Sequence, residues 1–337
     1  MSATAAVADS RRSMLLIMVL FAAFGLMWGV WAVVLADLNQ ALGLSAGALG
    51  LTLTLGTLAS LPTMFFGGPL ADRLGVRRVI SVAALAMVMA LTGIALVDGY
   101  ALFVLLLMIL FAGSGVYDVG INAAAAGYEQ RTHRRVMTWF HAAFSGAAAA
   151  GALLAGILLI LLPFRQLYLL LALLLLMVAV LIWLSHRLPV ASTPVLETRR
   201  PGLYRHPALL LLGFITGLGM LAEGAMEAWS AIYLRSYLEL PTLLGAAGVA
   251  VFHGAMFAGR ILAAPVVARV SRRRLLAASG ALAAAGMTLA LARETPALIL
   301  TGLLLVGLGL AIVVPVGFSL AGDLAPGRVG EATSVIA

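Results

Sequence analysis

Polar side chains that can hold or bind a proton stand within two apolar stretches in the first half of the chain. Asp118 and Asn122 are four residues apart, and His141 and Ser145 repeat that spacing in the next stretch. Residues four apart lie on the same face of an α-helix. The turn between the stretches centres near residue 130, almost equally distant from Asp118 and His141. In an antiparallel helix pair, these two side chains would lie at the same depth.

A similar group stands in the second half of the chain. Glu223 and Glu227 are again four residues apart and are followed by Trp229. His253 stands in the next apolar stretch, and with a turn near residue 239 it comes level with the two glutamates. Each half of the chain therefore offers at least one acid and a histidine at one level.

Such side chains are costly inside a membrane span and are usually functional or paired. A carboxyl group beside a histidine can load and release a proton as a cavity opens to each side in turn. The alternative is structural, a hydrogen bond that fixes the packing of two helices. Two acids without a basic neighbour in their own helix favour proton coupling for Glu223 and Glu227. For Asp118, His141 and His253 the structural alternative stays open.

Two further side-chain types in the apolar stretches could contact a solute. Trp28 and Trp31 offer rings on which a sugar could stack, although such aromatics more often contact lipid or other helices. Arg260 could pair with one of the acids or extend its guanidinium group to the inner surface.

The elements that position these side chains are long apolar helices. Hydrophobic residues make up 63% of the chain and charged residues 10%, which is outside the range of soluble proteins. A span needs about 20 apolar residues. This rule predicts ten transmembrane helices, over residues 14–37, 45–69, 78–97, 101–124, 137–162, 166–186, 207–235, 242–267, 274–292 and 297–322.

The basic residues indicate how these helices are oriented. All 21 are arginine, and the net charge is +8. They are scattered through short loops, so no nucleic-acid partner is expected. With the N-terminus inside, seventeen fall in inner segments and three in outer loops, while Arg260 lies within a helix. The excess of inner positive charge predicts a cytoplasmic N-terminus.

A short polar segment between two predicted helices, residues 67–78 (the polar island), is part of an internal repeat. The sequence over residues 68–78 aligns without a gap on residues 264–274, where a proline and three arginines coincide. The longest inner connection, 187–206, holds three prolines and four arginines. We therefore predict an N-terminal six-helix bundle over 1–186, a cytoplasmic linker over 187–206 and a C-terminal bundle over 207–337.

The polar island carries a family resemblance. Its sequence, Gly67-Gly68-Pro69-Leu70-Ala71-Asp72-Arg73-Leu74-Gly75-Val76-Arg77-Arg78, resembles the loop between helices 2 and 3 of the major facilitator superfamily, with Val76 in place of a more usual basic residue. The segment 222–230, with Asp118, Asn122 and His141, looks like a bacterial branch distantly similar to fucose permeases. The superfamily resemblance covers essentially the whole chain.

The resemblance implies an all-α polytopic membrane protein with two pseudo-symmetric bundles around a midplane cavity. It further implies a proton-coupled carrier of a small polar, sugar-like solute, monomeric and located in the bacterial inner membrane. Its partners would be that solute and the lipid bilayer. No cofactor is expected, and the proton gradient would be the driving force.

By the same resemblance the polar island is a conformational latch, in which the aspartate docks against the start of helix 11, where helix-end amides favour an anion. The latch residues are Gly68, Asp72, Arg73, Gly75, Arg77 and Arg78. Residues 330–337 resemble the first turn of helix 11. We therefore expect a C-terminally truncated form of a twelve-helix protein, whose inner gate closes poorly. A natural ten-helix protein is the alternative.

Three other functions compete with symport. Drug or metabolite efflux is less favoured, because the predicted fifth helix lacks the Gly-Pro pair of the antiporter signature and the fourth lacks an arginine. A non-transporting receptor or a lipid-handling protein could use the same fold. An enzyme is not expected, since the chain has no P-loop, no metal-ligand spacing and no cysteine.

Overall fold

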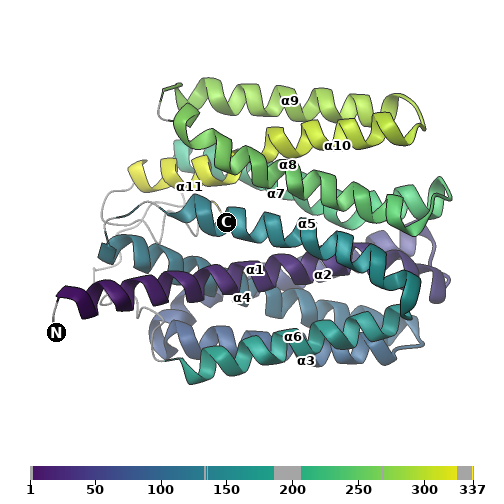
Figure 1. Ribbon diagram of the computed structural model, residues 1–337, viewed down its shortest axis with the longest axis horizontal. Helices are drawn as coiled ribbons and strands as arrows, with labels where there is room; N and C mark the ends of the chain where they lie inside the picture. The colour runs from purple at the N-terminus through teal and green to yellow at the C-terminus, as the bar shows by residue number, and fades with distance from the viewer. Residues whose placement is uncertain are drawn as a thin grey trace.

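The computed structural model describes residues 3–132, 134, 136–185, 206–267, 269–324 and 336. Within these ranges it is a bundle of α-helices without strands (Figure 1). The first six helices are α1 (Ala3–Ala41), α2 (Ala46–Leu74), α3 (Val76–Leu96), α4 (Tyr100–Thr132), α5 (Met137–Leu161) and α6 (Phe164–Leu184). The others are α7 (Pro207–Ile232), which continues as the π-helical turn η2 (Tyr233–Tyr237), α8 (Thr242–Val267), α9 (Arg272–Ala292), α10 (Pro296–Leu310) and α11 (Val313–Leu324).

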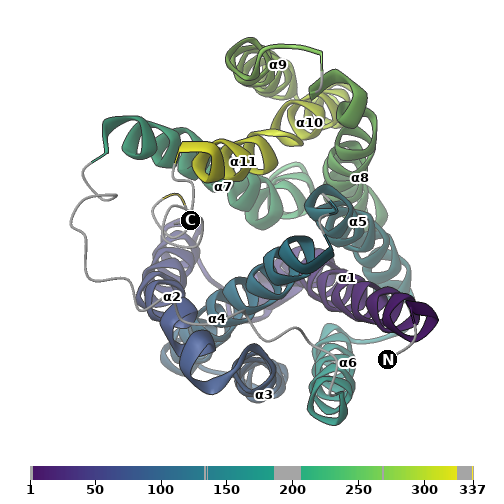
Figure 2. The ribbon, with the colours of Figure 1, turned by 90° about the vertical axis from the view of Figure 1, so that its left-hand side faces the viewer.

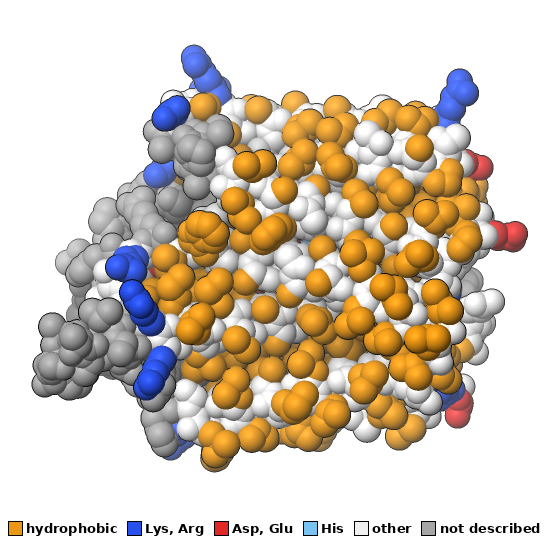
Figure 3. Space-filling model, viewed as in Figure 1, with side chains coloured by type: hydrophobic (Ala, Val, Ile, Leu, Met, Phe, Trp, Pro, Cys, Tyr) orange, Lys and Arg blue, Asp and Glu red, His pale blue; other side chains and the backbone are white. Residues whose placement is uncertain are grey.

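The helices confirm the predicted membrane architecture. The described part of the chain contains ten spans long and apolar enough to cross a membrane. Their side chains leave an apolar band exposed between two polar ends (Figure 3). Leu161, for example, is 73% exposed. Apolar exposure on this scale suits a lipid surrounding and would be unfavourable in water.

One predicted helix is corrected. The expected helix 297–322 is interrupted between α10 and α11, although both pieces belong to a single span, Pro296–Gly317. Pro315 has no backbone N–H and so cannot bond to the carbonyl of Ala311, four residues earlier. The Ala311 carbonyl instead accepts a hydrogen bond from Nε of Arg260 at 3.2 Å. The break therefore has a local cause and a tertiary partner.

Close packing of α1 on α5 sets the centre of the bundle. A Cβ atom added at Gly25 or Gly29 would overlap the backbone of α5, and one added at Gly151 would overlap the backbone of α1. Glycine at these positions allows the two helices to approach closely. On its other side α5 packs along α8, so α5 connects the first six helices to the remainder (Figure 2).

The two groups of helices lie on opposite sides of this connection. In Figure 2, α1–α6 occupy the lower part of the molecule and α7–α11 the upper part. The boundaries 1–186, 187–206 and 207–337 stay a prediction, because nearly all of the proposed linker lies outside the described residues.

The polar island forms the junction of α2 and α3. Gly75 separates the two helices with φ of +85°, a left-handed conformation that favours glycine. Arg77 donates through Nη1 to the carbonyl of Ser185 at 3.3 Å, and Arg78 is exposed. The surroundings of Gly68 and the side chains of Asp72 and Arg73 lie outside the described part. The latch function of this loop stays a prediction.

Candidate functional site

A cavity of about 190 Å³ lies between the two groups of helices. Six of the eight residues predicted for solute or proton binding line it: Trp28, Asp118, Asn122, His141, Glu223 and Glu227. They come from α1, α4, α5 and α7. Ligand pockets for drug-sized molecules occupy about 300–1,000 Å³, so this cavity has room for a small solute. The structure thus brings together residues that are more than 100 positions apart in the sequence.

The acid of the first half is paired within its own helix. The Nδ2 atom of Asn122 donates to Oδ1 and to the backbone carbonyl of Asp118, each at 3.0 Å. No ion pair joins Asp118 to a basic side chain among the described residues. His141 lines the same cavity, with its ring against that of Phe21. Its buried Nε2 atom has no hydrogen-bond partner in the described ranges.

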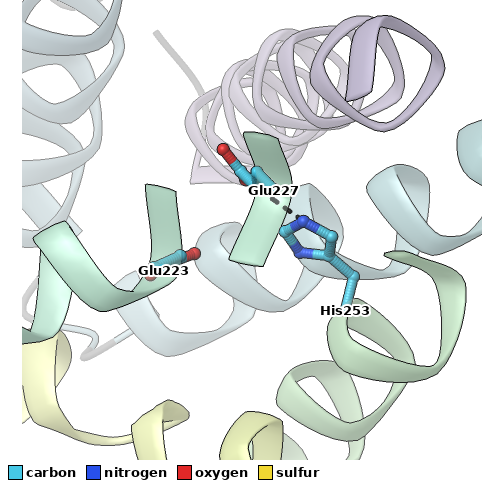
Figure 4. A group of neighbouring side chains, drawn as sticks. All are labelled: Glu223, Glu227 and His253. Atoms are coloured by element: carbon cyan, nitrogen blue, oxygen red, sulfur yellow. Dashed lines mark ion pairs between the residues drawn. The ribbon is translucent and has the colours of Figure 1, made fainter. Parts of the chain in front are cut away.

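The acids of the second half have partners on the neighbouring helix. Oε1 of Glu227 lies 3.1 Å from Nε2 of His253, which is fully buried behind the cavity (Figure 4). The direction of this contact does not meet the geometry of a hydrogen bond. Oε1 of Glu223 lies 3.6 Å from Nη2 of Arg260. The two acids therefore face different basic side chains.

These side chains also raise the question of a metal ion. The ligand atoms of Glu223, Glu227 and His253 lie within 4.8 Å of one another. The guanidinium group of Arg260 already stands beside Glu223, however, and would repel a second cation. The arrangement fits an ion-pair network better than a metal centre.

Arg260 is the hub of that network. Its side chain is 2% exposed, so the predicted alternative in which the guanidinium group extends to the inner surface is wrong. The other alternative, pairing with an acid, is what the structure shows. Its Nη1 atom donates to the carbonyl of His141 at 2.9 Å and to Oγ of Ser145. Its Nε atom donates to Ala311. One side chain of α8 thus connects α5, α7 and the break between α10 and α11.

An aromatic wall completes the cavity. Trp28 lines the space, whereas Trp31 is buried behind it with the ring centroids 5.0 Å apart. Phe21, Phe24 and Phe144 line the cavity as well. These phenylalanines were not among the residues predicted to bind a solute. The signal was present, because Phe21, Phe24 and Trp28 recur at intervals of three and four, which is the spacing of one helix face.

An ion pair between the two helix groups was also missed. Asp37 lies within α1 and pairs with Arg235 of η2 through two contacts of 2.5 and 2.9 Å. Arg235 also donates to the carbonyl of Val33. The sequence separation of 198 residues explains why no local pattern could reveal the pair.

Comparison with known proteins agrees with this architecture. The chain is 29% identical over 303 residues to an uncharacterised MFS-type transporter of Yersinia pestis, covering 89% of this chain and 77% of that protein. It is 29% identical to the membrane protein MosC of Rhizobium meliloti, covering 89% and 73% respectively.

Solved structures show the same fold at low sequence identity. The crystal structure of the nucleoside transporter NupG superposes with a TM-score of 0.77 at 14% identity, covering 96% of this chain and 86% of that one. A D-xylose-proton symporter gives a TM-score of 0.72 at 14% identity, with the same coverage of both chains. The family model of the Major Facilitator Superfamily matches residues 14–337. This chain therefore belongs to the major facilitator superfamily of membrane transporters.

Proposed function

We propose that the protein carries a small polar solute across the bacterial inner membrane by alternating access, coupled to proton entry. The observation that carries this proposal is the shared cavity, in which Asp118 of α4 meets Glu223 and Glu227 of α7. Acids from both halves can exchange protons with a space that opens to each side in turn. The D-xylose-proton symporter, which shares the fold, is an example of a sugar–proton symporter built on this architecture.

Arg260 provides a physical link between protonation and conformation. Ionised Glu223 balances the charge of Arg260, which in turn holds the backbone of α5. Protonation of Glu223 removes that balance and weakens the contact between α5 and α8. A proton thus binds the two conformations with different affinity, which is the requirement for coupling.

The charge distribution supports an orientation with the N-terminus in the cytoplasm. Arginine side chains gather at the end where α1 begins, and acidic side chains mark the opposite end (Figures 1 and 3). The positive-inside rule places the first end in the cytoplasm. The Asp37–Arg235 pair, close to the far end of α1, then lies toward the periplasm, and the polar island of residues 67–78 lies toward the cytoplasm.

Uptake by proteoliposomes under an imposed pH gradient tests the proposal. We expect a sugar-sized solute to accumulate in response to an inward proton gradient, and proton entry to accompany it. Uptake that is indifferent to the gradient would contradict symport, and solute movement against proton entry would indicate efflux. Absence of flux for every solute tried would favour a receptor.

Matched variants connect the measurement to the site. Glu223→Gln and Glu227→Gln should each reduce gradient-driven uptake strongly, by roughly 5–150-fold. Glu239→Gln is the control, because Glu239 is exposed and outside the cavity. If neither cavity variant alters gradient-dependent uptake, these acids are not the coupling groups.

A further inference from the structure

The charges of the cavity indicate the charge of its solute. Three carboxyl groups line it, from Asp118, Glu223 and Glu227, against a single arginine, Arg260. Uncompensated charge is costly in a space shielded from water. The lining of the described cavity is therefore acidic unless a proton or a positive ligand enters it.

The arginine is already engaged by groups of the protein. All three guanidinium nitrogens have protein partners: Nε at Ala311, Nη1 at His141 and Ser145, and Nη2 at Glu223. Arginines that recognise a carboxylate or phosphate present a free fork of donors to it. Arg260, which is 2% exposed, is held by these partners, so an anionic solute would have to compete with Glu223 for it.

Asp118 differs from the other two acids. Glu223 faces Arg260 and Glu227 faces His253, whereas Asp118 has only the amide of Asn122 within the described part of the chain. The Asn122 amide donates to only one of the two carboxylate oxygens of Asp118. The other oxygen and the buried Nε2 atom of His141, which has no hydrogen-bond partner there, both belong to side chains that line the cavity. A ligand could satisfy both.

The aromatic wall favours the same kind of ligand. Phe21, Phe24 and Trp28 of α1 and Phe144 of α5 line the cavity beside the acids. The faces of aromatic rings attract cations, and tryptophan attracts them most strongly. A carboxylate opposite aromatic rings is a combination that recognises an ammonium group.

We propose that the transported solute is a small organic cation, an amine-bearing ring or chain whose ammonium group binds Asp118 against the wall formed by Phe21, Phe24 and Trp28. This inference narrows the proposed function, on which it rests, from polar solutes in general to amines. Glu223 and Glu227, each of which lies beside a basic side chain, are left for proton coupling. The cavity volume of about 190 Å³ limits the solute to roughly the size of one sugar ring.

Binding to the purified full chain in detergent tests the charge class without transport. Two matched series serve as probes: glucosamine, glucose and glucuronate, and cyclohexylammonium, cyclohexanol and cyclohexanecarboxylate. Saturable binding raises the melting temperature. We expect at least one cation to bind about tenfold or more tightly than its neutral counterpart, and neither anion to bind.

Substitution of the acid identifies its role. Asp118→Asn should remove the preference for the cation and leave the melting temperature without ligand nearly unchanged, because asparagine keeps the shape of the side chain. Asp98→Asn is the control, since Asp98 is largely exposed and pairs with Arg165 outside the cavity. It should keep the preference.

The possible results separate this inference from the proposed function. Equal binding of neutral and cationic members, tighter binding of an anion, or no response to any cation would overturn the inference. A cation preference that survives Asp118→Asn would overturn the role of Asp118. Cation binding without proton-driven flux would support the inference and contradict the proposed coupling.

Discussion

The polar groups of the two halves have similar residues but different partners. In the second half, Glu227 lies 3.1 Å from the buried His253 and Glu223 faces Arg260. In the first half, His141 forms no ion pair with Asp118, and its backbone carbonyl rather than its ring contacts Arg260. Both groups line the cavity, but the acids of the second half lie beside basic side chains, whereas Asp118 has no ion-pair partner among the described residues. The difference suggests a division between a coupling group and a solute-binding group.

The largest expected effect on stability comes from replacing Arg260. Arg260→Met leaves Glu223 without its counter-charge and deprives the carbonyls of Ala311 and His141 of a donor. Breaking a buried pair in this way costs roughly 3–5 kcal/mol, measurable by thermal unfolding in detergent. Arg165→Met is the matched control, because its pair with Asp98 is exposed and worth about 0–1 kcal/mol. Equal losses in the two variants would show that Arg260 is not a hub.

The next effect separates the two groups by function. Glu223→Gln should reduce gradient-driven uptake by roughly 5–150-fold, the usual range of a coupling free energy. Asp118→Asn should instead raise the KM for the solute and keep the response to the gradient. Uptake measured over a series of solute concentrations, with and without the gradient, distinguishes them. The same kinetic change in both variants would remove the proposed division.

The histidines offer a smaller and more local comparison. His253→Gln deprives Glu227 of its buried partner and should lower the free energy of unfolding by about 1–3 kcal/mol. His141→Gln should cost less, because the ring of His141 has no ion pair among the described residues and its carbonyl is kept. Thermal unfolding of the two variants under one set of conditions makes the test. A larger loss for His141→Gln would contradict the described pairing.

The smallest expected effect concerns the aromatic wall. Trp28→Leu should weaken solute binding by roughly fivefold, because one cation-attracting face is lost. Trp31→Leu should act on stability instead, since Trp31 is 1% exposed and lies behind Trp28. Binding and melting temperature measured on both variants compare the two positions. An equal loss of affinity would mean that Trp31 also contacts the solute.

Much of the site could be predicted because its components are local. The pairs Asp118 with Asn122 and Glu223 with Glu227 follow from the spacing of four within one helix. The level of His253 beside the glutamates followed from counting residues on both sides of a turn, and the 3.1 Å contact with Glu227 agrees with it. The same count predicted one depth for His141 and Asp118, and in the structure both line the cavity, although α4 and α5 pack mainly on other helices.

Hydropathy and residue spacing by themselves determined the all-helical membrane architecture, the number of spans in the described chain and the candidate polar residues. These properties act over neighbouring residues, so they can be read along the chain. Only the tertiary structure decided that Arg260 contacts α5, Glu223 and Ala311. It also decided that Asp37 pairs with Arg235 and that Asp118 has no basic partner among the described residues. Those contacts depend on how distant helices pack, because a buried charge takes its partner from whichever neighbour the packing supplies.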